Sequence, residues 1–216
     1  PDTQSHIQQD RNARLYHPKD DYRPQRRALT RGAPDHVAIA LVGLPGSGKS
    51  AVGKRLAQRL QCEFIDSDHL IEERIGCSIR DYFEREGEEG FRNVEQDVLA
   101  TLARNPQGVL STGGGSVLRP ANRQVLGAHF HVIYLRSSPE DLYRRLRHDV
   151  KRPLLQVADP LARLRELHRA RDPLYREVAH QVVETGRPSV ATLVGLIARD
   201  FETPGNGPAA PDEPGA

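Results

Sequence analysis

The stretch that decides the fold is Gly43-Leu44-Pro45-Gly46-Ser47-Gly48-Lys49-Ser50. It matches the pattern GxxxxGK[ST] at every fixed position. An apolar run over 36–42 precedes it and predicts a strand. Residues 49–60 follow with one apolar face and one basic face, which predicts a helix. Strand, glycine-rich loop and helix in this order predict a P-loop, which cradles the phosphates of a nucleoside triphosphate.

Each residue type in this loop has a physical reason. Glycines let successive N–H groups point at phosphate oxygens, and the positive end of the following helix adds to that field. We expect Lys49 to reach the β- and γ-phosphates and the Ser50 hydroxyl to bind Mg²⁺. The alternative is a glycine-rich turn with an exposed lysine. The expected ATP contacts in the loop are Gly46, Ser47, Gly48, Lys49, Ser50 and Ala51.

The loop alone does not predict a reaction, because GTPases, motor ATPases and kinases share it. The rest of the sequence predicts the fold around it. Strands alternate with helices, which is typical of a parallel sheet covered on both faces. We therefore expect an α/β fold, a three-layer α/β/α domain with a five-stranded parallel sheet. Strands are predicted at 36–42, 63–65, 109–111, 131–135 and 181–184, and helices at 49–60, 69–74, 79–86, 91–103, 138–147, 160–171 and 189–201.

The two ends of the chain differ in composition from its middle. Residues 1–35 are polar and rich in arginine and proline, and residues 203–216 are rich in glycine and proline. Neither end can bury enough apolar surface to offset the entropy of ordering. We expect a loosely attached extension over 1–35, one domain over 36–202 and a tail over 203–216. The basic cluster at 23–27 is either part of the solvated extension or an arm for an acidic partner.

The overall composition argues against several classes of protein. There are 31 basic and 29 acidic side chains, and this near balance is unlike the one-signed surface of nucleic-acid-binding proteins. No apolar run reaches the roughly 18 residues that a membrane span needs. Cys62 and Cys77 form no metal or redox pattern and read as reduced thiols, so we expect a cytoplasmic protein.

Two carboxylates lie where an acceptor could meet the triphosphate. Asp66 and Asp68 end a predicted strand, and an extended backbone through Ser67 would point both to the same side. One could hold magnesium, and the other could accept the proton of an attacking hydroxyl. The alternative is that Asp68 only caps the next helix and that Asp66 is a turn residue.

Two further stretches could bind the acceptor. Arg92 and Glu95 are three residues apart on a predicted helix, so the carboxylate could orient the guanidinium as a clamp for a substrate carboxylate. The alternative is a surface ion pair worth ~0–1 kcal/mol. Residues 111–115 read Ser-Thr-Gly-Gly-Gly after a buried strand and allow a ligand to approach the backbone. Their alternative is a flexible turn.

The stretch over 148–155 has few core candidates and reads as a basic lid. A kinase needs such a lid to keep water from the γ-phosphate, and Arg152 could reach the phosphates from it. A solvated basic loop is the alternative. Arg171 lies beyond it, at the predicted end of a helix.

These motifs, in this order, resemble the shikimate kinase family. The resemblance extends over about residues 35–199 and rests on the P-loop together with 64–72, 87–95, 113–115, 152–155 and 171–175. It implies a nucleoside-monophosphate-kinase-like fold. It also implies transfer of the γ-phosphoryl group of ATP, with Mg²⁺, to the 3-hydroxyl of shikimate on the route to chorismate and the aromatic amino acids. Members of the family are usually monomers.

The resemblance assigns roles to individual residues. It implies that Asp68, Arg92, Gly114 and Arg171 hold shikimate, and that Asp68 is the base. The phosphate-stabilising pair would be Lys49 and Arg152, the magnesium residues Ser50 and Asp66, and the nucleotide contacts outside the loop Arg145, Arg187 and Pro188.

One departure from the family pattern is Ala51, which stands where a threonine is common. Two rival functions also remain. Another small-molecule kinase, such as a gluconate kinase, would share the loop and sheet, but the arginines, aspartate and glycines suit a carboxylate that bears hydroxyls. A non-catalytic ligand sensor should lack Lys49, Asp68 or Arg152, and all three are present.

Overall fold

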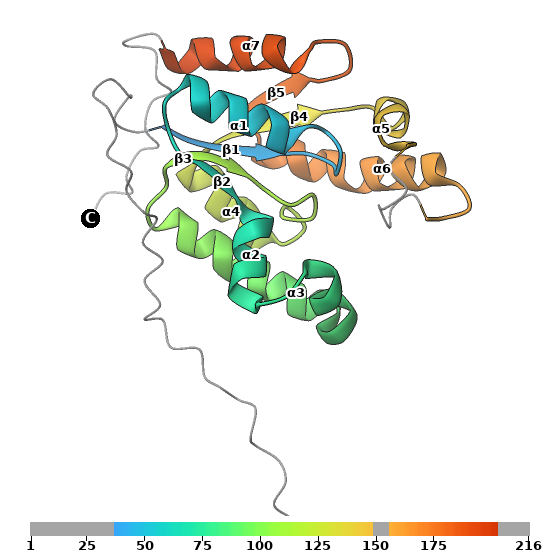
Figure 1. Cartoon of the computed structure of the whole chain (residues 1–216). Coiled ribbons are helices and arrows are strands. Elements are labelled where there is room, and N and C mark those ends of the chain that lie inside the picture. Colours follow the sequence, from blue (N-terminus) through green and yellow to red (C-terminus); the bar gives the residue numbers. More distant parts are fainter. Residues whose placement is uncertain (1–36, 149–155, 203–216) are drawn as a thin grey trace, which may run out of the picture. The chain divides into compact units, whose positions relative to one another are not determined.

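The computed structural model describes residues 37–148 and 156–202 (Figure 1). The predicted extension over 1–35, the tail over 203–216 and most of the predicted lid, with Arg152, lie outside the described residues. Within the described ranges, no helix is long and apolar enough to cross a membrane.

The sheet has five parallel strands, in the order β2-β3-β1-β4-β5. All five predicted strands are confirmed to within about two residues. Since the strands are parallel, their carboxyl ends lie at the same edge of the sheet. The order in which the chain adds strands reverses direction beside β1, and a ligand site is expected at that point of the edge. The strands are β1 Ala38–Val42, β2 Phe64–Asp66, β3 Gly108–Ser111, β4 His131–Arg136 and β5 Gln181–Glu184.

Helices cover both faces of the sheet (Figure 1). Alternate residues of β1 point to opposite faces: Ile39 and Leu41 pack in one core with α1 and α7, while Ala40 and Val42 pack in the other with α3, α4 and α6. The expected three layers are therefore confirmed. The helices are α1 Lys49–Arg59, α2 Ser67–Ile75, α3 Ile79–Ala103, α4 Pro120–His129, α5 Pro139–Leu146, α6 Pro160–Val178 and α7 Val190–Glu202.

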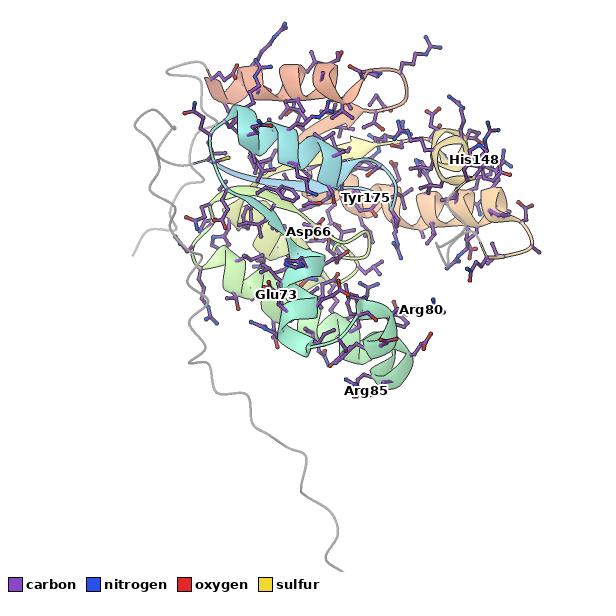
Figure 2. All side chains as sticks on the ribbon, viewed as in Figure 1. Asp66, Glu73, Arg80, Arg85, His148 and Tyr175 are labelled. Carbon is purple, nitrogen blue, oxygen red and sulfur yellow. The ribbon has the colours of Figure 1, made fainter. Side chains whose placement is uncertain are left out.

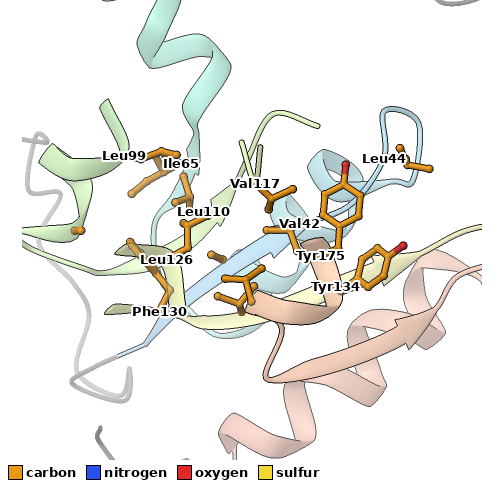
Figure 3. Close-up of a cluster of buried hydrophobic side chains, with 14 of the residues drawn as sticks. Val42, Leu44, Ile65, Leu99, Leu110, Val117, Leu126, Phe130, Tyr134 and Tyr175 are labelled. Atoms are coloured by element: carbon orange, nitrogen blue, oxygen red, sulfur yellow. The ribbon is translucent and has the colours of Figure 1, made fainter. Parts of the chain in front are cut away.

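One core lies between the sheet and helices α3, α4 and α6 (Figure 3). Leu110 of β3, Leu126 of α4 and Tyr134 of β4 are almost completely buried in it. Tyr134 packs against Tyr175 of α6, with 4.9 Å between the ring centroids. The rigid contact between β4 and α6 fixes the position of the Arg171 helix on the sheet.

Two helices differ from the sequence prediction. Helix α4 was not predicted, and helix α6 continues past Arg171 to Val178 although Pro173 lies within it. Proline lacks the N–H for a helical hydrogen bond, which favours a helix end. Here Tyr175 is fully buried and Val178 nearly so, and this burial holds the last turns in place.

Helix α3 has a break where the sequence predicted a gap between two helices. Gly87 adopts φ 75° and ψ −179°, a backbone conformation that glycine accepts readily. Ser78 begins the first part as its N-cap, its hydroxyl accepting from the Asp81 N–H at 3.1 Å. The break lets the second part, which carries Arg92 and Glu95, follow its own axis toward the sheet.

Candidate active site

The P-loop joins β1 to α1 as predicted. Gly46 and Gly48 have φ values of 83° and 95°, which an L side chain rarely adopts. Gly48 is the N-cap of α1 and offers no side-chain acceptor, so the first N–H groups of the helix remain open to an anion. The Lys49 ammonium is nearly buried and donates to the carbonyls of Gly43 and Leu44, at 2.8 and 3.0 Å. The loop thus concentrates positive charge at the carboxyl edge of the sheet.

Two other loop residues differ in their exposure. Ser47 is almost fully buried, and its hydroxyl has no hydrogen-bond partner within the described part of the chain. Ala51 is exposed in the first turn of α1. Alanine at this position can offer a nucleotide only its backbone groups, because its methyl side chain has no polar atom.

Three oxygen-bearing side chains converge next to the loop. The Ser50 hydroxyl lies 3.5 Å from Asp66 Oδ2 and 3.5 Å from the Ser111 hydroxyl. Ser111 ends β3 opposite Asp66 in the strand register, which explains why the two meet. A set of hydroxyl and carboxylate oxygens is what Mg²⁺ prefers in proteins, so these residues fit that ion. Sequence reasoning named Ser50 and Asp66 but not Ser111.

The geometry of the aspartate pair differs from the prediction. Helix α2 begins at Ser67, so the backbone is not extended between Asp66 and Asp68. Asp66 is the N-cap, because its Oδ1 accepts from the Asp68 N–H at 3.0 Å. Figure 2 shows Asp66 at the start of α2, near the carboxyl edge of the sheet. One Asp66 oxygen therefore serves the helix, while the other faces Ser50.

Asp68 lies in the first turn of α2, where its carboxylate meets several charges. Burial raises its pKa, the carboxylates of Asp66 and Glu72 raise it further, and Lys49 and Arg92 oppose that rise. A Cβ on Gly113 would come within 2.8 Å of Asp68 Oδ1. The carboxylate thus lies between the P-loop lysine and the glycine turn, and its raised pKa suits a group that accepts a proton.

The predicted pair of Arg92 and Glu95 is largely buried and is not a surface ion pair. Arg92 Nη1 donates to Glu95 Oε1 at 2.7 Å, and the two side chains are 12% and 1% exposed. Arg92 Nε also lies 3.5 Å from the exposed Glu88 carboxylate. Burial raises the pKa of Glu95, with Arg92 opposing. Separating the two side chains would leave a buried charge without its partner, which costs free energy. The pair therefore stays together and holds the guanidinium in one place.

The glycine turn after β3 is in contact with three other parts of the site. A Cβ on Gly113 would meet Asp68, one on Gly114 would meet Pro45 of the P-loop, and one on Gly115 would overlap the Arg92 guanidinium. Thr112 anchors the turn, since its hydroxyl donates to the Leu41 carbonyl at 2.9 Å. Glycine at each position lets the donor loop and the acceptor groups approach one backbone segment.

Arg171 reaches the same region from α6. Burial raises the pKa of Glu95 and of Tyr175, and the charge of Arg171 opposes both rises, so the guanidinium lies near these groups. Tyr175, four residues further along the same helix face, donates from its hydroxyl to the Gly114 carbonyl at 2.5 Å. Sequence reasoning gave Tyr175 no role. Its spacing from Arg171 was the available signal.

Three nucleotide candidates remain, Arg145 in α5 and both Arg187 and Pro188 in the loop between β5 and α7. Arg145 of α5 donates to the Thr185 carbonyl and to the Ser137 hydroxyl, the latter at 3.4 Å. Arg187 is exposed in the loop between β5 and α7. Arg145 is thus held against the loops that follow β4 and β5, at the edge where the P-loop lies.

The sequence and fold of the chain are similar to those of known proteins. The family model described as shikimate kinase matches residues 45–201. The chain belongs to the shikimate kinase family. A shikimate kinase of Paracidovorax citrulli is 56% identical over 178 residues, which is 81% of this chain and 97% of the relative. One of Burkholderia thailandensis is 52% identical over 170 residues, 79% and 92% of the two chains.

Solved structures agree with this membership. Shikimate kinase from Acinetobacter baumannii in complex with shikimate is 44% identical, with a TM-score of 0.72 over 76% of this chain and 92% of that one. Shikimate kinase from Bacteroides thetaiotaomicron is 30% identical, with a TM-score of 0.70 over 76% and 97%. The fold expected from the family is therefore confirmed.

Proposed function

We propose that the chain transfers the γ-phosphoryl group of ATP to the 3-hydroxyl of shikimate, on the route to chorismate and the aromatic amino acids. The observation that carries this proposal is the meeting of Asp68, the Arg92–Glu95 pair and the glycine turn beside the P-loop. Membership of the shikimate kinase family supports the choice of acceptor and of ATP as donor. A polyhydroxylated carboxylate suits a site with oriented arginines and a buried carboxylate.

The P-loop and α5 hold the donor in this proposal. Lys49 and the N–H groups at the start of α1 bind the phosphates. Arg152, outside the described residues, stabilises the transferring phosphoryl group. The proposed nucleotide contacts are Gly46, Ser47, Gly48, Lys49, Ser50, Ala51, Arg145, Arg152, Arg187 and Pro188.

Mg²⁺ would be held by Ser50 and Asp66, whose oxygens face each other, with Ser111 close by. A bound magnesium ion neutralises phosphate charge during phosphoryl transfer. The fold orients one of these oxygen ligands. Asp66 Oδ1 accepts the N-cap hydrogen bond of α2, and this bond fixes the orientation of Oδ2.

The acceptor is held by residues from three elements. Arg92 and Arg171 bind its carboxylate, Gly114 offers backbone groups, and Asp68 binds the ring hydroxyls. Asp68 is the base in this mechanism: it aligns the 3-hydroxyl for in-line attack and accepts its proton. The raised pKa of Asp68 supports that role, because it brings the pKa of the base closer to that of the hydroxyl that gives up the proton.

The unit that performs the reaction is proposed to be the domain over 36–202, as a monomer in the cytoplasm. The matched family region, 45–201, lies within these bounds.

A coupled ADP-release assay with ATP and Mg²⁺ tests the proposal, with shikimate, quinate and gluconate as acceptors. We expect turnover with shikimate well above that with the other two. Asp68→Asn should reduce turnover sharply and leave ATP affinity unchanged. Tight shikimate binding without turnover would instead identify a ligand sensor, and near-normal turnover of Asp68→Asn would remove Asp68 from the mechanism.

A further inference from the structure

The glycine turn contains a peptide whose orientation is not fixed by the turn itself. The Ser116 N–H donates to the Gly113 carbonyl at 3.1 Å, which closes a four-residue β-turn over 113–116. The central peptide joins Gly114 to Gly115. In such a turn the hydrogen bond between the first and fourth residues leaves the carbonyl and N–H of the central peptide unused.

Glycine makes this central peptide able to flip. Type I and type II turns differ in the orientation of the central peptide, and type II needs a positive φ at the third position. Gly115 occupies that position and does not have a positive φ, so the turn is not of type II. Because glycine adopts positive φ at little cost, the backbone alone would allow both orientations.

Tyr175 bonds the group that distinguishes the two orientations. Its hydroxyl donates to the Gly114 carbonyl at 2.5 Å. The ring is fully buried and packs against Tyr134, so the hydroxyl has a fixed position. In a trans peptide the carbonyl and the following N–H point in opposite directions. The Gly115 N–H is therefore directed away from Tyr175, and a flip would reverse it.

We propose that Tyr175 is a positioning residue that holds the Gly114–Gly115 peptide in the orientation in which the turn binds the acceptor. This inference rests on the proposed function, in which Gly114 contacts shikimate. Tyr175 and Arg171 lie one turn apart on α6, so the helix proposed to bind the acceptor carboxylate also carries the phenol that bonds the turn. The hydroxyl stays protonated at neutral pH, since burial raises the pKa of Tyr175 to about 12 despite the opposing charge of Arg171.

The test is Tyr175→Phe, with Tyr134→Phe as the matched control. Both variants lose a buried phenol hydroxyl with one acceptor, but the Tyr134 hydroxyl donates to Asp172 at 2.8 Å and not to the turn. For Tyr175→Phe we expect the KM and the calorimetric Kd for shikimate to rise about tenfold, as for the loss of one well-placed hydrogen bond. The KM for ATP should stay at its wild-type value, and Tm should fall at least as far in Tyr134→Phe, whose lost bond goes to a carboxylate.

The comparison separates positioning from stability. A shikimate Kd for Tyr175→Phe equal to that of the wild type would overturn the proposal, as would an equal rise in Tyr134→Phe. Failure of the wild type to phosphorylate shikimate would refute the proposed function itself. That failure would be seen in the ADP-release assay of the wild type and not in the comparison of the two variants.

Nuclear magnetic resonance of ¹⁵N-glycine-labelled protein gives a second readout that does not need catalysis. We expect the Gly115 amide signal to broaden or shift in Tyr175→Phe, since the peptide would then sample both orientations. A Gly115 signal identical to that of the wild type would show that Tyr175 does not fix this peptide.

Discussion

Replacing Gly115 with alanine should impair the acceptor site without unfolding the protein. The new Cβ would lie 2.5 Å from Arg92 Nη1, whereas an ordinary contact needs at least 3.4 Å. The guanidinium must therefore move by roughly 1 Å, and a misplacement of about that size costs on the order of 100-fold in rate. The movement also weakens the 2.7 Å bond to Glu95. We expect kcat/KM for shikimate to fall about 100-fold.

The assay is steady-state ADP release with shikimate varied at saturating ATP, and then the reverse. The KM for ATP should not change, because the three atoms nearest the new Cβ all belong to Arg92 and none to the P-loop. Gly127→Ala is the matched control: it lies in α4, and its new Cβ would meet only Val178, at 3.6 Å. That variant should keep full activity and gain about 0.5–1 kcal/mol in free energy of unfolding. Unchanged kcat/KM for shikimate in Gly115→Ala would refute this account of the turn.

Three further predictions concern the base, a helix cap and the core. Because the pKa of Asp68 is raised, the acid limb of the kcat/KM profile for shikimate should lie above the ordinary aspartate range. A raised carboxyl pKa means that the folded state favours the protonated form, so ionisation destabilises the fold as pH rises through that pKa. Asp68→Asn should therefore unfold at a higher urea concentration than the wild type at neutral pH, and a lower midpoint would contradict this sign. The Ser138 hydroxyl accepts from the Asp141 N–H at 3.1 Å and caps the start of α5. Ser138→Ala should therefore lower the free energy of unfolding by about 1 kcal/mol. An unchanged urea midpoint would contradict the contribution of this cap. Leu126 is 0% exposed, and Leu126→Ala should cost about 2–5 kcal/mol in chemical denaturation, with a loss below that range implying that the core collapses around the cavity.

Much of the fold could be predicted from the sequence, because the strands and most helices have strong local signals. Helix α4 lacks them. Its N-cap, Arg119, makes no side-chain cap, and Asn122 occupies a buried position where an apolar residue would complete the period. Asn122 is satisfied there by the Ser116 carbonyl, to which its Nδ2 donates at 2.9 Å. Only the tertiary contact explains an inward-facing amide.

Helix α6 shows a tertiary contact overriding a local signal. Pro173 predicts an end, and the burial of Tyr175 and Val178 on the next turns outweighs it. The same continuation places Tyr175 under the glycine turn. The error at Pro173 thus also hid the candidate positioning residue.

For the site, residue types and their order were enough to select the candidates, but not their geometry. Asp66 and Asp68 were expected on one side of a strand, and the early start of α2 instead gives them different surroundings. Ser111 was hidden because its meeting with Ser50 depends on the strand order, which places β3 between β1 and β2. Long-range strand pairing is not visible in local patterns.

The crowding of the glycine turn has a consequence for drug resistance. A side chain at Gly113, Gly114 or Gly115 would collide with Asp68, Pro45 or Arg92 respectively. An inhibitor anchored on the backbone of this turn would meet a target with few viable escape mutations, since each such substitution also disturbs a group that we propose takes part in the reaction. Compounds that depend on exposed side chains such as Arg187 would lack that protection, because those residues can change without strain in the fold.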